Sequence, residues 1–299
     1  HYNPFADHAF LLALEESGSA IPETGWAARH LVIESSDAGQ IAGIVPLYLK
    51  SHSQGEYIFD HGWAEAWHRA GGQYYPKLLS AIPFTPAGGS RLLIRSGPGE
   101  QMARAALTEG LIALTAQYNA SSLHINFLPE EDWRDLGTQG FLQRTDQQFH
   151  WLNRDFKDFD GFLASLTSRK RKNLKKERQR ALENGIEIEW LTGDDLTEAH
   201  WDTFYDFYLD TSNRKWGQAY LTRSFFNRIN ATMPDKTLLV MARRDGKYIA
   251  GALNFIGGEV LFGRNWGCIE DHPFLHFELC YYQAIDFAIL RGLKRVEAG

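Results

Sequence analysis

The sequence predicts an α/β protein with mixed sheets, built from two similar modules that a basic helix joins. The chain has 299 residues, 44% of them hydrophobic, and a chain of this length usually forms more than one hydrophobic core. A hairpin, a helix and a strand recur in the same order in both halves. Between the halves, residues 169–180 hold eight Lys or Arg and one Glu. We therefore place one module at residues 1–154 and the other, which includes the basic helix, at residues 155–299.

The first module begins with a predicted hairpin. Residues 30–50 form two apolar segments around a polar turn at residues 35–40. A helix is expected over residues 100–118 and a strand over residues 122–127. About 40 residues between the hairpin and this helix have no counterpart in the second module. Gly and Pro cluster in this insertion, so we expect it to form turns and loops.

The second module begins with the basic helix, on which Leu166, Leu174 and either Ala181 or Leu182 leave one narrow apolar stripe. A helix, a hairpin, a further helix and a strand are then expected at residues 194–213, 238–257, 275–291 and 294–297. The first of these helices carries an aromatic stripe that predicts core packing, formed by Trp201, Phe204, Tyr205 and Tyr208.

Composition argues against several classes of protein. The longest nearly uncharged apolar stretch, residues 41–49, is about half the roughly 18 residues that suggest a membrane-spanning helix. The two cysteines, Cys268 and Cys280, are too few for a secreted scaffold built on disulfides, which favours a cytoplasmic location. The chain has no RNP, KH or helix-turn-helix signature, so sequence-specific recognition of DNA is not expected.

The formal charge of −6 hides an uneven distribution. Without residues 169–180 the chain holds 23 basic and 36 acidic residues, so one cationic stripe lies on an acidic body. Such a stripe is either a solvated face or the binding site of an anionic partner. The phosphates of tRNA, of a nucleotide-linked precursor or of a lipid pyrophosphate would all fit, and peripheral membrane contact remains open. The anion-binding candidates are Arg169, Lys170, Arg171, Lys172, Lys175 and Lys176.

Several segments resemble known families. The strand that ends at Phe84, the Gly-containing loop, the helix from Glu100 and the Gly140-Phe141 pair resemble the GNAT-type acyltransferase fold. Residues 169–176 and 272–278 are similar to segments of Fem-type peptidyltransferases. The whole chain resembles the bacterial Fem-like family of peptidoglycan biosynthesis or recognition proteins. The segments that carry this closer match are residues 48–53, 59–63, 74–77, 212–217 and 252–257.

The resemblance implies two tandem GNAT-like acyltransferase domains. Fem-type relatives move an amino acid from aminoacyl-tRNA to an amine of a cell-wall precursor, whereas ordinary GNAT proteins use acetyl-CoA. The implied donor is therefore aminoacyl-tRNA or an acyl-CoA, and no tightly bound cofactor is implied. In Fem-like proteins the last strand leads into further structure, so the second module is expected to continue beyond Gly299.

Two glycine loops in the first module depart from the GNAT pattern for binding CoA. They lie at residues 87–91 and 95–99, and neither has the usual Q/R-x-x-G-x-G/A spacing. Pro98 lacks an N–H group, and Glu100 would place a carboxylate where a phosphate should bind. We expect two tight turns here rather than a CoA site.

Direct acyl transfer needs a group that accepts the proton of the amine and donors for the developing oxyanion. Glu278 is one candidate base, on the expectation that partial burial raises its pKa, although a carboxylate at this place can equally stabilise the helix start. His276 is the second candidate, ranked below Glu278. The substrate-binding candidates are Arg214, Lys215, Trp216, Asn254, Arg264, Trp266 and Tyr281. His272 and His276 are four residues apart, but no further ligand completes a zinc site, so no metal is expected.

The sequence thus favours an acyl- or aminoacyl-transferase that acts on an amine of a cell-envelope precursor. The alternative is a non-catalytic binding module of degenerate transferase fold that recognises a peptidoglycan precursor or another anionic ligand. An RNA-binding protein that uses the basic helix is a third class.

Overall fold

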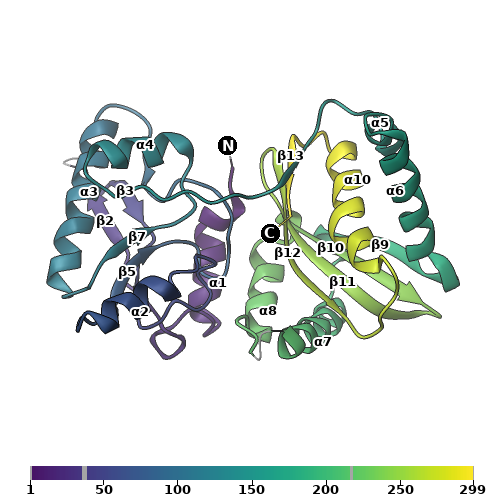
Figure 1. Cartoon of the computed structure of the whole chain (residues 1–299), viewed down its shortest axis with the longest axis horizontal. Helices are drawn as coiled ribbons and strands as arrows, with labels where there is room; N and C mark the ends of the chain where they lie inside the picture. Colours follow the sequence, from purple (N-terminus) through teal and green to yellow (C-terminus); the bar gives the residue numbers. More distant parts are fainter. Residues whose placement is uncertain (1, 36–38, 216–217, 299) are drawn as a thin grey trace. The chain divides into compact units, whose positions relative to one another are not determined.

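The computed structural model describes residues 2–35, 39–215 and 218–298, and it divides into two units (Figure 1). The N-terminal unit comprises Leu14–Asp146. The C-terminal unit comprises His1–Ala13 together with Gln147–Gly299.

The boundary expected between residues 154 and 155 lies inside the C-terminal unit. Strand β8 (His150–Leu152) pairs with β13 (Arg295–Glu297), so the end of the expected first module belongs to the sheet of the C-terminal unit. The start of the chain belongs there too, because the ring of Phe5 packs edge-on against Phe255 and Phe262. Both differences arise from contacts between residues that are far apart in the sequence.

The N-terminal unit is a mixed α/β body. Its strands are β1 (Trp26–Ala28), β2 (Leu31–Glu34), β3 (Ile41–Val45), β4 (Tyr48–Lys50), β5 (Lys77–Ser80), β6 (Leu93–Ile94) and β7 (Leu123–Ile125). Its helices are the end of α1 (His8–Glu16), α2 (His61–Arg69), α3 (Glu100–Gln117) and α4 (Glu130–Thr138).

Two sheets form in this unit. One has the strand order β1-β4-β5-β7, in which only the β5–β7 pair is parallel. The other is antiparallel, in the order β2-β3-β6. Helix α3 packs on β2 and β3, and Gly43 permits the close approach, since a Cβ there would lie 2.9 Å from Leu107 Cδ1. Strands β2 and β3 form the predicted hairpin, although residues 36–38 of its turn lie outside the described residues. The predicted second segment divides into β3 and β4, which belong to different sheets, and the predicted helix and strand are confirmed as α3 and β7.

The C-terminal unit contains a larger sheet. Its strands are β8, β9 (Glu187–Leu191), β10 (Thr237–Arg244), β11 (Lys247–Ile256), β12 (Val260–Cys268) and β13. Its helices are α5 (Phe159–Ala164), α6 (Ser168–Ala181), α7 (Glu198–Lys215), α8 (Arg223–Thr232), α9 (Leu275–Phe277), the π-helical turn η6 (Glu278–Tyr282) and α10 (Gln283–Leu290).

The six strands follow the order β8-β13-β12-β11-β10-β9, and only β12 and β13 are parallel. Alternate residues of β10 face opposite sides, as the pleat requires. Leu238 and Val240 pack in the core that includes α10, whereas Met241 points to the side of α7. Helix α7 approaches β12 so closely that a Cβ on Gly267 would lie 2.2 Å from the carbonyl oxygen of Phe207. Both faces of the sheet are therefore covered.

The predicted hairpin and basic helix of the second module are present as β10–β11 and α6. The aromatic stripe of α7 is core packing, as expected, with Trp201 and Phe204 fully buried. The helix expected over residues 275–291 differs from the prediction, because η6 interrupts it with one wide turn. This turn directs Glu278 and Tyr282 to the same neighbour, helix α6.

Candidate functional site

Three residues predicted from the sequence lie together in the C-terminal unit. Trp266 lies on β12, His276 in α9 and Tyr281 in η6. The ring centroid of His276 is 5.1 Å from that of Trp266 and 5.8 Å from that of Tyr281. All three side chains are half-buried, and burial raises the pKa of Tyr281. An imidazole between aromatic rings that solvent still reaches can accept a proton from a bound amine.

Glu278 has different surroundings from those expected. Both of its carboxylate oxygens accept hydrogen bonds from Arg178 Nε, at 3.1 and 3.2 Å, and Oε1 also accepts from Arg178 Nη2 at 2.8 Å. Gln283 Nε2 donates to the same oxygen at 2.8 Å. The side chain is completely buried, whereas partial burial was expected. A carboxylate enclosed in this way holds an arginine, so the geometry favours a structural role for Glu278 over the catalytic one.

Arg178 is the centre of a network that joins α6 to α10. It also pairs with Asp286 at 2.8 Å, and its guanidinium lies 4.2 Å from the ring centroid of Phe159. Burial acts to lower the pKa of Arg178, but the hydrogen bonds and charges of Glu278 and Asp286 outweigh burial and hold that pKa above its ordinary value. The preceding residue, Glu177, accepts a hydrogen bond from the hydroxyl of Tyr282 at 2.5 Å. The basic helix is therefore fixed by its own charged residues.

Asn254 lies on the same face of the sheet as Trp266. In the register, Ala252 is opposite Trp266 and Asn254 is opposite Gly263. Asn254 is buried, and its amide donates to the carbonyl oxygen of Ala252 at 3.3 Å, while its own Oδ1 has no hydrogen-bond partner among the described residues. A buried amide oxygen without a partner is a position at which a substrate N–H could bind.

The other predicted substrate-binding residues do not join this group. Arg264 lies at the irregularity where β11 and β12 change register, and its guanidinium is 5.9 Å from the ring centroid of Phe5. Arg214 is exposed and pairs with Asp210 at 2.6 Å. Lys215 ends α7, and its side chain and Trp216 lie outside the described residues.

The basic helix divides its cations between two tasks. Arg171 donates to the carbonyl oxygens of Leu163, Ala164 and Leu166, which closes the end of α5. Lys175 pairs with Asp160 at 2.9 Å. Each of these two residues thus has a partner within the protein, and its expected anion-binding role stays a prediction. The exposed cations with no ion pair recorded in the described structure are Arg169, Lys170, Lys172, Lys176 and Arg180.

An open hollow of about 550 Å³ lies beside this helix, lined by Asp158, Phe159, Asp160, Leu163, Lys175, Arg178 and Asp286. The cations that line the hollow, Lys175 and Arg178, are already paired with its carboxylates.

No group of three or more His, Cys, Asp or Glu that could hold a metal is found in the described residues. Within the same residues, no helix has the length and apolar character needed to cross a membrane.

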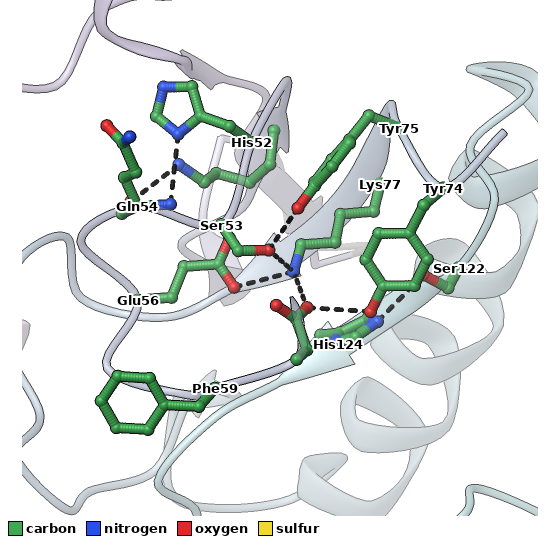
Figure 2. Close-up of polar contacts among 12 residues, drawn as sticks. His52, Ser53, Gln54, Glu56, Phe59, Tyr74, Tyr75, Lys77, Ser122 and His124 are labelled. Carbon is green, nitrogen blue, oxygen red and sulfur yellow. Dashed lines mark hydrogen bonds and ion pairs between the residues drawn. The ribbon is translucent and has the colours of Figure 1, made fainter. Parts of the chain in front are cut away.

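The N-terminal unit contains a buried charge cluster that the sequence did not predict. Lys50, Glu56, Asp60 and Lys77 are almost completely inaccessible to solvent. Lys77 Nζ donates to Ser53 Oγ at 2.8 Å, to Glu56 Oε2 at 2.9 Å and to Asp60 Oδ2. Figure 2 shows how further hydroxyl groups extend this cluster, from Tyr75 to Ser53 and from Tyr74 to Asp60, each at 2.8 Å.

The strand register explains why the cluster needs two carboxylates. Lys50 on β4 lies directly opposite Lys77 on β5. Two like charges in this position repel each other, and burial strengthens the repulsion. Glu56 and Asp60, from the loop between β4 and α2, supply the opposite charges.

The cluster holds a lysine whose pKa lies near neutral pH. Burial and the charge of Lys77 outweigh the attraction of the carboxylates and lower the pKa of Lys50 to about 7. Lys50 Nζ makes only a long hydrogen bond, 3.5 Å to the carbonyl oxygen of Gln54, and lies 3.6 Å from the ring centroid of Trp26. Burial also raises the pKa of Glu56. Groups perturbed by burial and by specific partners are typical of functional sites.

His124 lies at the edge of the cluster. Burial and the charge of Lys77 lower its pKa to about 4, so its imidazole is neutral at physiological pH. It forms a hydrogen bond with Ser122 at 2.9 Å. The cluster thus has one neutral histidine beside its charged core.

A signal for this cluster was present in the sequence. Lys50, Ser53, Asp60 and Lys77 lie in segments that carry the family resemblance, and all but Lys50 lie in the insertion of the first module. Lys50 and Lys77 are also lysines at inward positions of otherwise apolar strands, a position where lysine is rarely found unless it has a partner.

A model of the FemAB-like family, described as peptidoglycan biosynthesis/recognition, matches residues 1–299. No match was found among curated proteins.

Several solved structures have a similar fold. FemX has a TM-score of 0.54 and 14% identity, with 99% of this chain and 87% of that chain covered. L-PGS from Bacillus licheniformis has a TM-score of 0.55 and 11% identity, with 99% and 77% covered. The C-terminal domain of a putative lysylphosphatidylglycerol synthetase from Agrobacterium fabrum has a TM-score of 0.50 and 9% identity, with 96% and 77% covered. At such identities the likeness shows the fold alone. The predicted fold class and family resemblance are confirmed.

Proposed function

Because the chain belongs to the FemAB-like family of peptidoglycan biosynthesis/recognition, we propose that it is a cytoplasmic transferase. In this proposal it moves an acyl or aminoacyl group to an amine of a cell-envelope precursor by direct transfer. The observation that carries the proposal is the gathering of His276 with Trp266 and Tyr281, in a chain that the family model matches from end to end.

His276 is the proposed proton acceptor. The nitrogen of the acceptor amine attacks the carbonyl carbon of the donor, and the imidazole takes the N–H proton as the C–N bond forms. The bond to the leaving oxygen or sulfur then breaks, and that atom takes up the proton from His276. Trp266 and Tyr281 hold the ring on two sides, which fixes its orientation. The unpartnered Oδ1 of Asn254, on the same sheet face as Trp266, is a candidate acceptor for an N–H of the substrate.

The basic helix is the proposed contact with the anionic part of a substrate. Arg169, Lys172, Lys176 and Arg180 are separated by three or four residues, so they share one helix face over about 16 Å. This row of cations matches a chain of phosphates better than it matches a single carboxylate. Aminoacyl-tRNA is the donor that such a row favours, with an acyl-CoA as the alternative.

The row predicts a definite salt dependence. Four phosphate contacts give a slope of about −3 in a plot of log K against log salt concentration. Replacing Lys172 and Lys176 by Gln should lower the magnitude of that slope by about half. Lys157, an exposed lysine outside the helix, provides the matched control. A binding constant independent of salt would count against this contact.

The transfer itself is tested with labelled aminoacyl-tRNA or acyl-CoA and muramyl-peptide precursors that carry a free amine. His276→Ala should reduce transfer by about a hundredfold or more, because general bases contribute 10²–10⁴ in rate. His272→Gln is the matched control, since His272 Nε2 forms a hydrogen bond with Glu270 at 2.7 Å. Full activity of His276→Ala would refute the assignment of the base.

A non-catalytic binding module is the second candidate. The specific observation in its favour is that Glu278, the strongest base predicted from the sequence, is enclosed by Arg178 and Gln283. In that case the purified protein would be stabilised by a muramyl-peptide precursor in a thermal-shift measurement but would transfer no label from either donor.

A further inference from the structure

An aromatic face lies on the outside of the N-terminal unit, over the loop and the helix that follow β4. It is formed by Tyr57, Phe59, Trp63 and Trp67, whose exposed fractions are 41%, 73%, 57% and 52%. Large exposed aromatic groups that cluster in this way usually mark an interaction site. Neither the family description nor the proposed transfer reaction uses this face.

The buried charge cluster holds the loop part of the face in place. Glu56 and Asp60 point inward to Lys77, and two of the three residues between them, Tyr57 and Phe59, are exposed. Figure 2 shows Phe59 directed away from the cluster. Tyr57 has a φ of 56°, a strained conformation for a residue with a side chain, which the two ion pairs on either side of it maintain. The loop is thus built to present its aromatic residues outward.

Helix α2 continues the face. Ala64 is its only buried residue, so the helix rests on the unit along a narrow line. Trp63 and Trp67 are four residues apart and share one side of the helix. The guanidinium of Arg144 lies 5.3 Å from the ring centroid of Trp63, and its Nη2 donates to the carbonyl oxygen of Phe59 at 3.5 Å. Arg144 therefore connects the helix part of the face to the loop part.

We propose that the aromatic face docks on a membrane surface that contains anionic lipids. Trp and Tyr have apolar rings with one polar atom, and side chains of this kind concentrate at the boundary between water and lipid. Ile58, between Tyr57 and Phe59, is half-buried, so aromatic rings make up the most exposed part of the loop. A short helix that exposes two Trp on one side can lie in the plane of the lipid headgroups.

The charges around the face select an anionic surface. Arg69 and Arg144 border it, and the single carboxylate exposed on α2, Glu65, is 3.9 Å from Arg69. Cations that lie close to an anionic membrane are attracted to its negative surface potential. Docking of this kind would bring the chain to precursors carried by lipids, but it requires none of the groups in the proposed transfer site.

The test is sedimentation of the full chain with vesicles of phosphatidylcholine, with and without phosphatidylglycerol. The wild type should bind the anionic vesicles, and Trp63→Ser combined with Trp67→Ser should weaken that binding at least tenfold. The matched control is Met102→Ser combined with Ile112→Ser, because these α3 residues are 74% and 54% exposed and lie outside the face. All of these substitutions are on the surface, and circular dichroism checks that each variant is folded.

Quenching of tryptophan fluorescence by brominated lipid gives a second measurement. It should occur in the wild type and be lost in the Trp63/Trp67 variant. Arg69→Gln combined with Arg144→Gln should reduce binding to the level seen without phosphatidylglycerol. The proposal is overturned if the wild type does not sediment, if the double Trp variant binds as the wild type does, or if a soluble muramyl peptide alone perturbs these tryptophans. Transfer to a soluble precursor does not depend on any of these outcomes.

Discussion

Replacing Lys50 by Met tests whether the buried charge cluster titrates near neutral pH. The pKa of Lys50 is lowered from about 10.5 to about 7 in the folded protein. Between these two values the unfolded chain binds a proton at this residue and the folded chain does not. The free energy of unfolding of the N-terminal unit should therefore rise with pH, by up to about 1.4 kcal/mol per pH unit. Across the whole window the free energy of unfolding rises by about 4–5 kcal/mol in total. None of this gain is present at pH values where Lys50 is protonated in both the folded and the unfolded state.

Lys50→Met removes the titrating amine but keeps a side chain of similar length on the ring of Trp26. Urea unfolding from pH 6 to pH 10 measures the free energy for the wild type and the variant. The wild-type slope between pH 7 and pH 10 should be largely lost in the variant, so that the variant is at least as stable as the wild type near pH 7. Lys157→Met, at an exposed lysine, is the control and should leave the slope unchanged. Equal slopes in the wild type and Lys50→Met would refute the reasoning.

Three further predictions concern single residues. Glu278→Gln should lower the free energy of unfolding by about 3 kcal/mol, because it leaves Arg178 partly buried without its main partner, but it should leave transfer by the folded protein intact. A loss of transfer without a loss of stability would restore Glu278 as the base. His124→Gln should flatten the pH dependence of stability between about pH 4 and pH 6.5, where the unfolded chain binds a proton that the folded chain excludes; an unchanged profile in acid denaturation contradicts this. Gly267→Ala should cost about 1–3 kcal/mol in a thermal or urea measurement, since its Cβ would meet the carbonyl oxygen of Phe207 at 2.2 Å, and a neutral effect would show that α7 can move away from β12.

The elements that the sequence predicted correctly are those whose signal is local. The strands of both hairpins, helix α3 and the basic helix α6 each have a periodic pattern within their own residues. The domain boundary did not follow from such patterns. Strand β8 is assigned by its pairing with β13, and Phe5 by its contacts with Phe255 and Phe262, all far away in the chain.

The candidate sites show the same division. Trp266, His276 and Tyr281 were found because they lie within about 20 residues of one another around a strand and the following helix. The buried charge cluster was not predicted, because it depends on the register between β4 and β5, which places Lys50 opposite Lys77. Its carboxylates come from a loop, where an acidic residue is normally solvated and carries no signal of burial.

The basic helix illustrates why a charge pattern alone is ambiguous. Arg178 is separated from Glu278 by 100 residues, so no local spacing reveals that the helix is held by a buried ion pair. The same helix uses Arg171 to close α5 and Lys175 to bind Asp160. Removing these three cations from the count leaves five with no ion pair recorded in the described structure, and four of them, at residues 169, 172, 176 and 180, form one row. A helix fixed on one side by its own charges holds the cations on the other side in a fixed row. For the proposed contact with a polyanion, that arrangement lowers the entropy lost on binding, and it limits the proposed anion site to fewer residues than the sequence total of eight basic residues.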